Sequence, residues 1–209
     1  MLIDMTLKDF LAELRSSSPA PGGGSAAALA GAVGAALAAM VGNLTAGNDK
    51  YRAVQDEVKA LLPQLDGQLA RLQRYVDEDT AVFNKVMAAY RLPKAGDEEK
   101  AARSLAIQQA LKEAAALPMA VADCCAAVLT VARRMLAIGN ANAASDAAVA
   151  GRLAHTAMWA AIYNVRINLG SIKDEDFAAA LRRQIAATLV KADADLAALL
   201  AEADGKIGL

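Results

Sequence analysis

One acidic residue occupies a position where the sequence pattern calls for an apolar side chain. Apolar residues recur alternately four and three positions apart, the spacing of one face of a helix: Leu65, Leu69, Leu72, Val76, Phe83, Val86 and Tyr90. Asp79 takes the matching position between Val76 and Phe83. Burial penalises a carboxylate and raises its pKa, so Asp79 is a candidate proton donor or acceptor. The alternative is a structural buried salt bridge or a polar residue that fixes helix register.

Three consecutive glycines precede a helix that carries no charge. Gly22, Gly23 and Gly24 lead into Ser25 and the run AAALAGAVGAALAAMVGNL. Free N–H groups at a helix N-terminus, with no Cβ beside them, favour an anion. The segment lacks the GK[ST] of a phosphate loop and follows no strand, so it does not predict nucleotide binding. A flexible helix cap is the alternative to a ligand site.

Asn164 and Asn168 lie one turn apart on an alanine-rich helix. Their carboxamides would read the donors and acceptors of a heterocycle, or would form hydrogen bonds between helices. The single histidine, His155, is interpreted as a core or interface residue, although its role stays open. Cys124 and Cys125 are adjacent and match no zinc-ligand spacing, so no metal site is predicted.

The composition is typical of an all-helical protein with closely packed helices. Hydrophobic residues make up 56% of the 209 residues and aromatics only 4%, and alanine is the best helix former. The net charge of −1 provides no global positive field, so nucleic acid is not expected as a partner. No secretory signal is recognised, and free cysteines fit a reducing compartment, so we predict a cytoplasmic protein.

The uncharged run from Ala26 to Leu44 is long enough to span a bilayer. Its alanines and glycines gain little from hydrocarbon, so no membrane partner is predicted. Small residues recur every four positions along this run, which favours close approach of other helices.

Helical patterns cover most of the chain, and no run alternates as a strand would. We predict one domain over residues 1–209, an all-α bundle of about seven helices joined by short loops. Proline and capping chemistry predict the boundaries: caps at Thr6, at Ser145 or Asp146 and at Asp174; a break or kink at Pro63 in a helix over 51–91; and a helix start near Pro118.

Six short motifs together resemble the cyclodeaminase/cyclohydrolase domain of folate one-carbon metabolism. This domain forms the C-terminal part of formiminotransferase-cyclodeaminase and also occurs as a stand-alone methenyltetrahydrofolate cyclohydrolase. The motifs occur in the family's order, at similar spacing, over nearly the whole chain: PGGGS (21–25), VDEDTAVF (76–83), RLPK (91–94), GN (139–140), SD (145–146) and NVRINL (164–169). One such motif is a weak indication, whereas six in order are specific.

The resemblance implies a homodimer with the folate site in a cleft near the subunit interface. It implies that Asp79 is the catalytic residue, the same residue that the apolar seam singles out. The glycines Gly22 to Gly24, with Ser25, are implied to lie against folate and its anionic glutamate tail. The remaining motifs carry over further substrate-binding residues: Lys94, Asn140, Asp146, Asn164 and Asn168. We expect no cofactor beyond the tetrahydrofolate substrate.

The implied reaction is the reversible hydrolysis of 5,10-methenyltetrahydrofolate, a cationic amidinium, to 10-formyltetrahydrofolate. An anionic Asp79 would attract the cation, accept a proton from the attacking water and return it to the departing ring nitrogen. No formiminotransferase domain is recognised in these residues, which favours the cyclohydrolase. The alternatives are a formiminotetrahydrofolate cyclodeaminase that releases ammonia, and a non-catalytic helical folate-binding or scaffold protein.

Overall fold

The computed structural model describes residues 1–208, so Leu209, the last residue of the predicted domain, lies outside it. These residues form six α-helices, three short 3₁₀ turns and no strand. The α-helices are α1 (Leu7–Leu14), α2 (Gly23–Thr45), α3 (Gln55–Tyr90), α4 (Asp97–Ile138), α5 (Ala144–Leu169) and α6 (Glu175–Ile207). The 3₁₀ turns are η1 (Leu2–Asp4), η2 (Asp49–Val54) and η3 (Ala141–Ala143). The predicted all-α bundle is confirmed, with six helices where about seven were expected.

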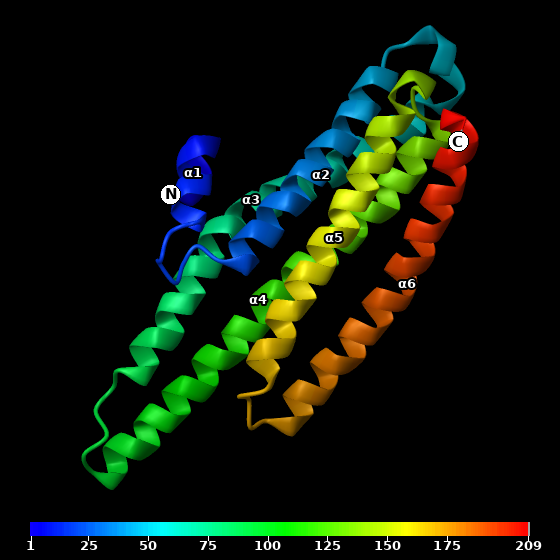
Figure 1. Cartoon of the computed structure of the whole chain (residues 1–209). Coiled ribbons are helices and arrows are strands. Elements are labelled where there is room, and N and C mark those ends of the chain that lie inside the picture. The colour runs from blue at the N-terminus through cyan, green and yellow to red at the C-terminus, as the bar shows by residue number, and fades with distance from the viewer. Residues whose placement is uncertain (209) are drawn as a thin grey trace.

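The helices α2 to α5 lie alongside one another, and α6 covers α4 and α5 (Figure 1). The longest helix, α4, packs against α2, α3, α5 and α6 and forms the centre of the bundle. The short α1 lies to one side and buries Phe10. The α3–α4 hairpin extends beyond the other helices at one end (Figure 1).

Small residues on α2 let its neighbours approach closely, as the sequence predicts. A row at four-residue spacing is buried: Ala27, Gly31, Ala35 and Ala39. A Cβ placed on Gly34 would lie 3.1 Å from the carbonyl oxygen of Ala150 on α5, so the two backbones nearly touch there.

Both α2 and α4 are long and apolar enough, by length and composition, to cross a membrane. More than half of the apolar window of each helix, 61% and 56%, is buried inside the bundle. Contacts between helices therefore account for their apolar composition.

Two prolines lie inside continuous helices rather than at helix boundaries. The helix α3 starts at Gln55, after η2, and continues through Pro63, where a break or kink is predicted. The helix α4 continues through Pro118, so the predicted helix start there is wrong. Proline removes one backbone donor, and a helix tolerates this when the freed carbonyl finds another partner.

The first and last helices begin as predicted. Thr6 Oγ1 accepts a hydrogen bond from the Asp9 N–H at 3.1 Å, and Asp174 Oδ1 accepts one from the Phe177 N–H at 3.0 Å. Each side chain satisfies a backbone donor that the first helical turn leaves free.

The predicted cap of α5 at Ser145 or Asp146 is wrong. The turn η3 runs directly into α5, which begins at Ala144 without a side-chain cap. Asn140 caps η3 instead, because its Oδ1 accepts a hydrogen bond from the Asn142 N–H at 3.0 Å.

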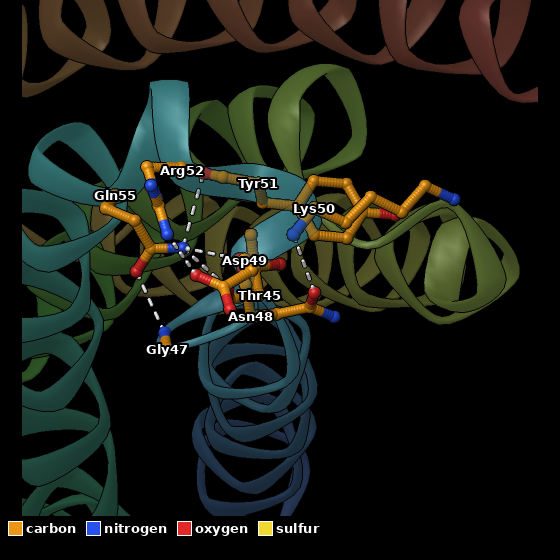
Figure 2. A network of polar contacts seen from close by, with 8 residues as sticks. All are labelled: Thr45, Gly47, Asn48, Asp49, Lys50, Tyr51, Arg52 and Gln55. Carbon is orange, nitrogen blue, oxygen red and sulfur yellow. Dashed lines mark hydrogen bonds and ion pairs between the residues drawn. The ribbon is translucent and has the colours of Figure 1, made fainter.

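The connection between α2 and α3 is held by side chains of the turn itself (Figure 2). Gln55 Oε1 accepts a hydrogen bond from the Gly47 N–H at 2.8 Å, and Gln55 Nε2 donates to the Thr45 carbonyl at 2.9 Å. Asn48 Oδ1 accepts a hydrogen bond from the Lys50 N–H at 3.0 Å. These bonds fix the C-terminal end of α2, the end opposite the three glycines.

Candidate functional site

A cavity of about 350 Å³ lies where the N-terminus of α2 meets α3, α4 and α5. Its walls are mostly apolar, and Val82, Phe83, Leu117 and Ile167 contribute large side chains. Asp79 is the one ionisable side chain among the described residues that line it, and Asn164 and Asn168 are the other polar ones. The cavity therefore brings together a carboxylate, two carboxamides and the glycines at residues 22–24.

Asp79 lies where the apolar seam of α3 passes from the core into this cavity. Leu65, Leu72 and Val76 are fully buried, whereas Phe83 and Val86, beyond Asp79, line the cavity. The seam places Asp79 at the cavity wall rather than in solid core, which explains how a carboxylate is accommodated there.

Ser25, in the first turn of α2, forms hydrogen bonds with the Asp79 carboxylate. The Ser25 N–H donates a hydrogen bond to Asp79 Oδ2 at 2.9 Å. Ser25 Oγ lies 3.0 Å from the same oxygen and 2.9 Å from the carbonyl oxygen of Val76. A hydroxyl has one proton, so it donates to one of these two acceptors at a time. Ser25 itself is fully buried and does not line the cavity.

The anion at this helix N-terminus is thus a side chain of the protein. The sequence predicts that the α2 N-terminus favours an anion, and the Asp79 carboxylate takes that position. Ser25 contacts Asp79 and does not line the cavity, whereas Gly22, Gly23 and Gly24 do.

Burial raises the pKa of Asp79 above its ordinary value, and the two hydrogen bonds from Ser25 oppose part of this rise. Loss of water around the carboxylate is the larger effect, so the pKa rises overall. No basic side chain within residues 1–208 contributes to the pKa of Asp79, so the alternative of a buried salt bridge is not supported. Such a carboxyl group suits general acid–base catalysis.

The glycines differ in how much room they leave. A Cβ on Gly24 would overlap the Asp79 carboxylate and lie 2.5 Å from its Cγ. A Cβ on Gly23 would lie 3.6 Å from Asn164 Nδ2, and one on Gly22 would lie 3.8 Å from the Pro19 carbonyl oxygen, both ordinary contacts. Gly24 is therefore required for the close approach of α2 to Asp79.

The two asparagines turn their oxygens away from the helix backbone. Asn164 Nδ2 donates to the Ala160 carbonyl at 2.9 Å. Asn168 Nδ2 donates to the carbonyls of Ala114 at 2.7 Å and Asn164 at 3.0 Å. Because carbonyl oxygens accept and do not donate, each amide nitrogen must face the backbone. Oδ1 of each residue is left as its free acceptor.

The other predicted site residues lie outside this cavity. Lys94 is exposed in the loop between α3 and α4. Asn140 caps η3, and its backbone N–H donates to Thr45 Oγ1 at 2.8 Å. Asp146 lies in the first turn of α5, about 27 Å along the helix from Asn164 at 1.5 Å per residue. Within one chain, the structure therefore does not bring these three residues to Asp79.

His155 lies outside the cavity and connects two helices. Its Nε2 is 2.7 Å from Asp193 Oδ1 on α6, so the pair joins α5 to α6. Cys124 and Cys125 are free and buried in α4. In the part of the chain that the structure describes, no three His, Cys, Asp or Glu side chains gather where they would hold a metal ion. Activity without a metal stays a prediction.

Most of the apolar cavity wall, which includes Ala114 and Pro118, is not predicted from the sequence as part of a site. The available signal was a proline within a strongly helical, apolar segment. The sequence predicts a helix start at this proline, whereas in the structure the helix is continuous and the proline leaves one carbonyl without its helical donor.

Residues 6–187 match the sequence profile of formiminotransferase-cyclodeaminase. The chain belongs to this family. It is 42% identical over 189 residues to a methenyltetrahydrofolate cyclohydrolase of Methylorubrum extorquens, covering 90% of this chain and 91% of that protein. It is 35% identical over 199 residues to the formimidoyltransferase-cyclodeaminase of Sus scrofa, covering 95% of this chain but 37% of the longer relative.

A solved structure has the same fold. The crystal structure of a formiminotetrahydrofolate cyclodeaminase from Thermotoga maritima superimposes with a TM-score of 0.89 at 28% identity. The match covers 99% of this chain and all of the other. The similarity predicted from six motifs is therefore confirmed over nearly the whole chain.

Proposed function

We propose that this protein is a methenyltetrahydrofolate cyclohydrolase, which hydrolyses 5,10-methenyltetrahydrofolate reversibly to 10-formyltetrahydrofolate. The observation that carries the proposal is the charge of the cavity. Among the described residues that line it, Asp79 is the one with an ionisable side chain, and Asn164 and Asn168 present acceptor oxygens. A cavity with these groups favours a cationic, N–H-bearing ligand, and methenyltetrahydrofolate is a cationic amidinium.

The proposed mechanism uses Asp79 first as a base and then as an acid. Water adds to the bridging carbon of the amidinium while Asp79 accepts one of its protons. The C–N bond to one ring nitrogen then breaks as Asp79 returns the proton to that nitrogen. The added hydroxyl loses its own proton to solvent as it becomes the formyl C=O on the other nitrogen, so the cation and water give a neutral product and one released proton. A carboxyl group whose pKa is raised toward neutral pH is suited to both transfers.

The size of the cavity supports binding of the heterocyclic part of the substrate. At about 350 Å³ it falls at the small end of the range for ligand pockets. We place the heterocycle in the cavity and the glutamate tail outside it, with Gly22 and Gly23 at the boundary. Lys94 lies outside the cavity, so it would contact the substrate only through the glutamate tail.

The comparisons favour the cyclohydrolase over the cyclodeaminase. The relative named methenyltetrahydrofolate cyclohydrolase is 42% identical and is matched over 91% of its length. The cyclodeaminase from Thermotoga maritima is 28% identical. Release of ammonia from formiminotetrahydrofolate remains the second candidate, because one acid–base carboxylate would also serve that reaction.

We further propose that the protein is a homodimer that closes this cavity. Ile167 on the cavity wall is 76% exposed, and the adjacent helices α2 and α5 expose further large apolar side chains, among them Val33, Met40 and Tyr163. A second copy packed on this surface would remove these side chains from water. If the two α5 helices ran antiparallel, the Asp146 end of one would lie beside the Asn164 end of the other. In such a dimer, Asn140 and Asp146 of one copy would lie near the cavity of the other.

We propose a cytoplasmic enzyme, because the two cysteines are free. The net charge of −1 and the burial of the apolar helices favour the absence of nucleic-acid and membrane partners. A tetrahydrofolate substrate is the only small molecule that the proposed reaction needs besides water.

Loss of methenyltetrahydrofolate absorbance, measured with and without protein, tests the proposed function. We expect turnover by the wild-type protein and a loss of about 10²-fold or more in Asp79→Asn. Glu78→Gln is the matched control, since Glu78 is the exposed neighbour on the same helix. Ammonia release from formiminotetrahydrofolate without methenyl hydrolysis would favour the cyclodeaminase, and folate binding without either reaction would favour a non-catalytic protein.

A further inference from the structure

The carbonyl oxygen of Ala114 has lost its usual partner in α4. In an α-helix the carbonyl of residue i accepts the N–H of residue i+4, and for Ala114 that residue is Pro118, which has no N–H. The helix nevertheless continues through Pro118 to Ile138. Both residues line the cavity, so the unpaired carbonyl is created at the wall of the site.

Asn168 on α5 supplies the missing donor. Its Nδ2 donates to the Ala114 carbonyl at 2.7 Å and to the Asn164 carbonyl at 3.0 Å, one turn back in its own helix. These two bonds use both hydrogens of the amide nitrogen. The carboxamide is therefore fixed in one orientation, and only its Oδ1 remains to meet a ligand.

We propose that Pro118 is a positioning residue for the substrate, acting through the Ala114 carbonyl on Asn168. Because Pro118 has no N–H, the Ala114 carbonyl is free to accept the hydrogen bond from Asn168. The Asn168 side chain, fixed by this bond, then presents its Oδ1 acceptor to an N–H group of the ligand. This inference rests on the proposed function for the identity of the ligand. The anchor itself is a property of the folded chain and does not depend on that identity.

A double-mutant cycle in thermal stability tests the anchor without any substrate. Asn168→Ala leaves the buried Ala114 carbonyl without a partner, and we expect Tm to fall by roughly 3–8 °C. In a Pro118→Ala background, residue 118 has an N–H that can pair with this carbonyl. We therefore expect Asn168→Ala to lower Tm by less than half as much there. An equal loss in both backgrounds would overturn the anchor.

Steady-state kinetics test whether the anchor positions substrate. In Pro118→Ala the new N–H competes with Asn168 for the carbonyl, so we expect KM for methenyltetrahydrofolate to rise several-fold while kcat changes little, because Asp79 is untouched. Pro63→Ala is the matched control, since Pro63 is an exposed proline inside α3, outside the cavity lining. It should change neither constant.

Four outcomes separate the claims. An unchanged KM in Pro118→Ala, or an equal rise in Pro63→Ala, would refute the positioning role. A fall in kcat with KM unchanged would refute it as well, because the effect would then lie on the chemical step. If the wild-type protein shows no turnover, the proposed function fails; the cycle in Tm still decides the anchor, and calorimetric binding of 10-formyltetrahydrofolate to Pro118→Ala and Pro63→Ala replaces KM.

Discussion

Gly24→Ala is the smallest change that should disable the site. The added Cβ would lie 2.5 Å from Asp79 Cγ and 2.8 Å from Oδ2, whereas ordinary contacts begin near 3.4 Å. The Cβ would lie closer still to Oδ1, so the carboxylate must move by about 1 Å or more. Such a shift lengthens the hydrogen bonds of 2.9 and 3.0 Å from Ser25 beyond their normal range.

The size of the effect follows from that displacement. A misplacement of about 1 Å in a reacting group costs about 10²-fold in rate, so kcat for methenyltetrahydrofolate hydrolysis should fall by about 10²-fold in Gly24→Ala. Overpacking should cost about 1–3 kcal/mol, seen as a Tm lower by roughly 3–10 °C. Circular dichroism at the assay temperature checks that the variant is still folded.

Gly23→Ala is the control for the position of Asp79. Its Cβ would make an ordinary contact of 3.6 Å with Asn164 Nδ2 and none with Asp79, so kcat should stay close to that of the wild type, whereas KM can change because Gly23 lines the cavity. A folded Gly24→Ala variant that keeps more than about a tenth of its activity would refute the steric argument. Equal losses in both variants would show that the loop, and not Asp79, is sensitive.

Three further predictions concern pH, metal and assembly. Ser25→Ala removes a hydrogen bond that lowers the pKa of Asp79, so the acidic limb of the kcat/KM profile should move to higher pH; an unmoved limb would assign that limb to another group. A chelator should leave turnover unchanged, and a loss restored by a divalent ion would contradict this. Light scattering should show a dimer, and Val33→Asp or Tyr163→Asp, at exposed apolar positions, should weaken it; a wild-type monomer at assay concentration would refute the dimer.

Sequence alone singles out Asp79 as a candidate because one polar residue interrupts an otherwise continuous apolar period, and the structure places it at the cavity wall. The same periodicity does not reveal where the seam leaves the core, which depends on how α2, α4 and α5 surround the cavity beside α3. The family resemblance implies that Ser25 contacts the substrate, whereas the structure shows it bonded to Asp79. Its hydrogen bonds to Asp79 join residues 54 positions apart, and no local pattern encodes that distance.

The prolines show a similar limit. A proline is read as a helix boundary because it removes a donor, and this reading is sound within one segment. Whether the helix continues depends on a donor from elsewhere, and for Pro118 that donor is Asn168 on α5. The capping residues Thr6 and Asp174 could be predicted because their partners lie three residues away.

The position of the Ser25 hydroxyl between two acceptors has a consequence for the reaction cycle. When Asp79 is ionised, the hydroxyl donates to its Oδ2; when Asp79 has taken up a proton and accepts more weakly, the hydroxyl can turn to the Val76 carbonyl. Rotation about a single C–O bond is therefore enough to match the hydroxyl to either protonation state. Neither state leaves the buried hydroxyl without an acceptor, so the bundle can remain rigid while the proton comes and goes.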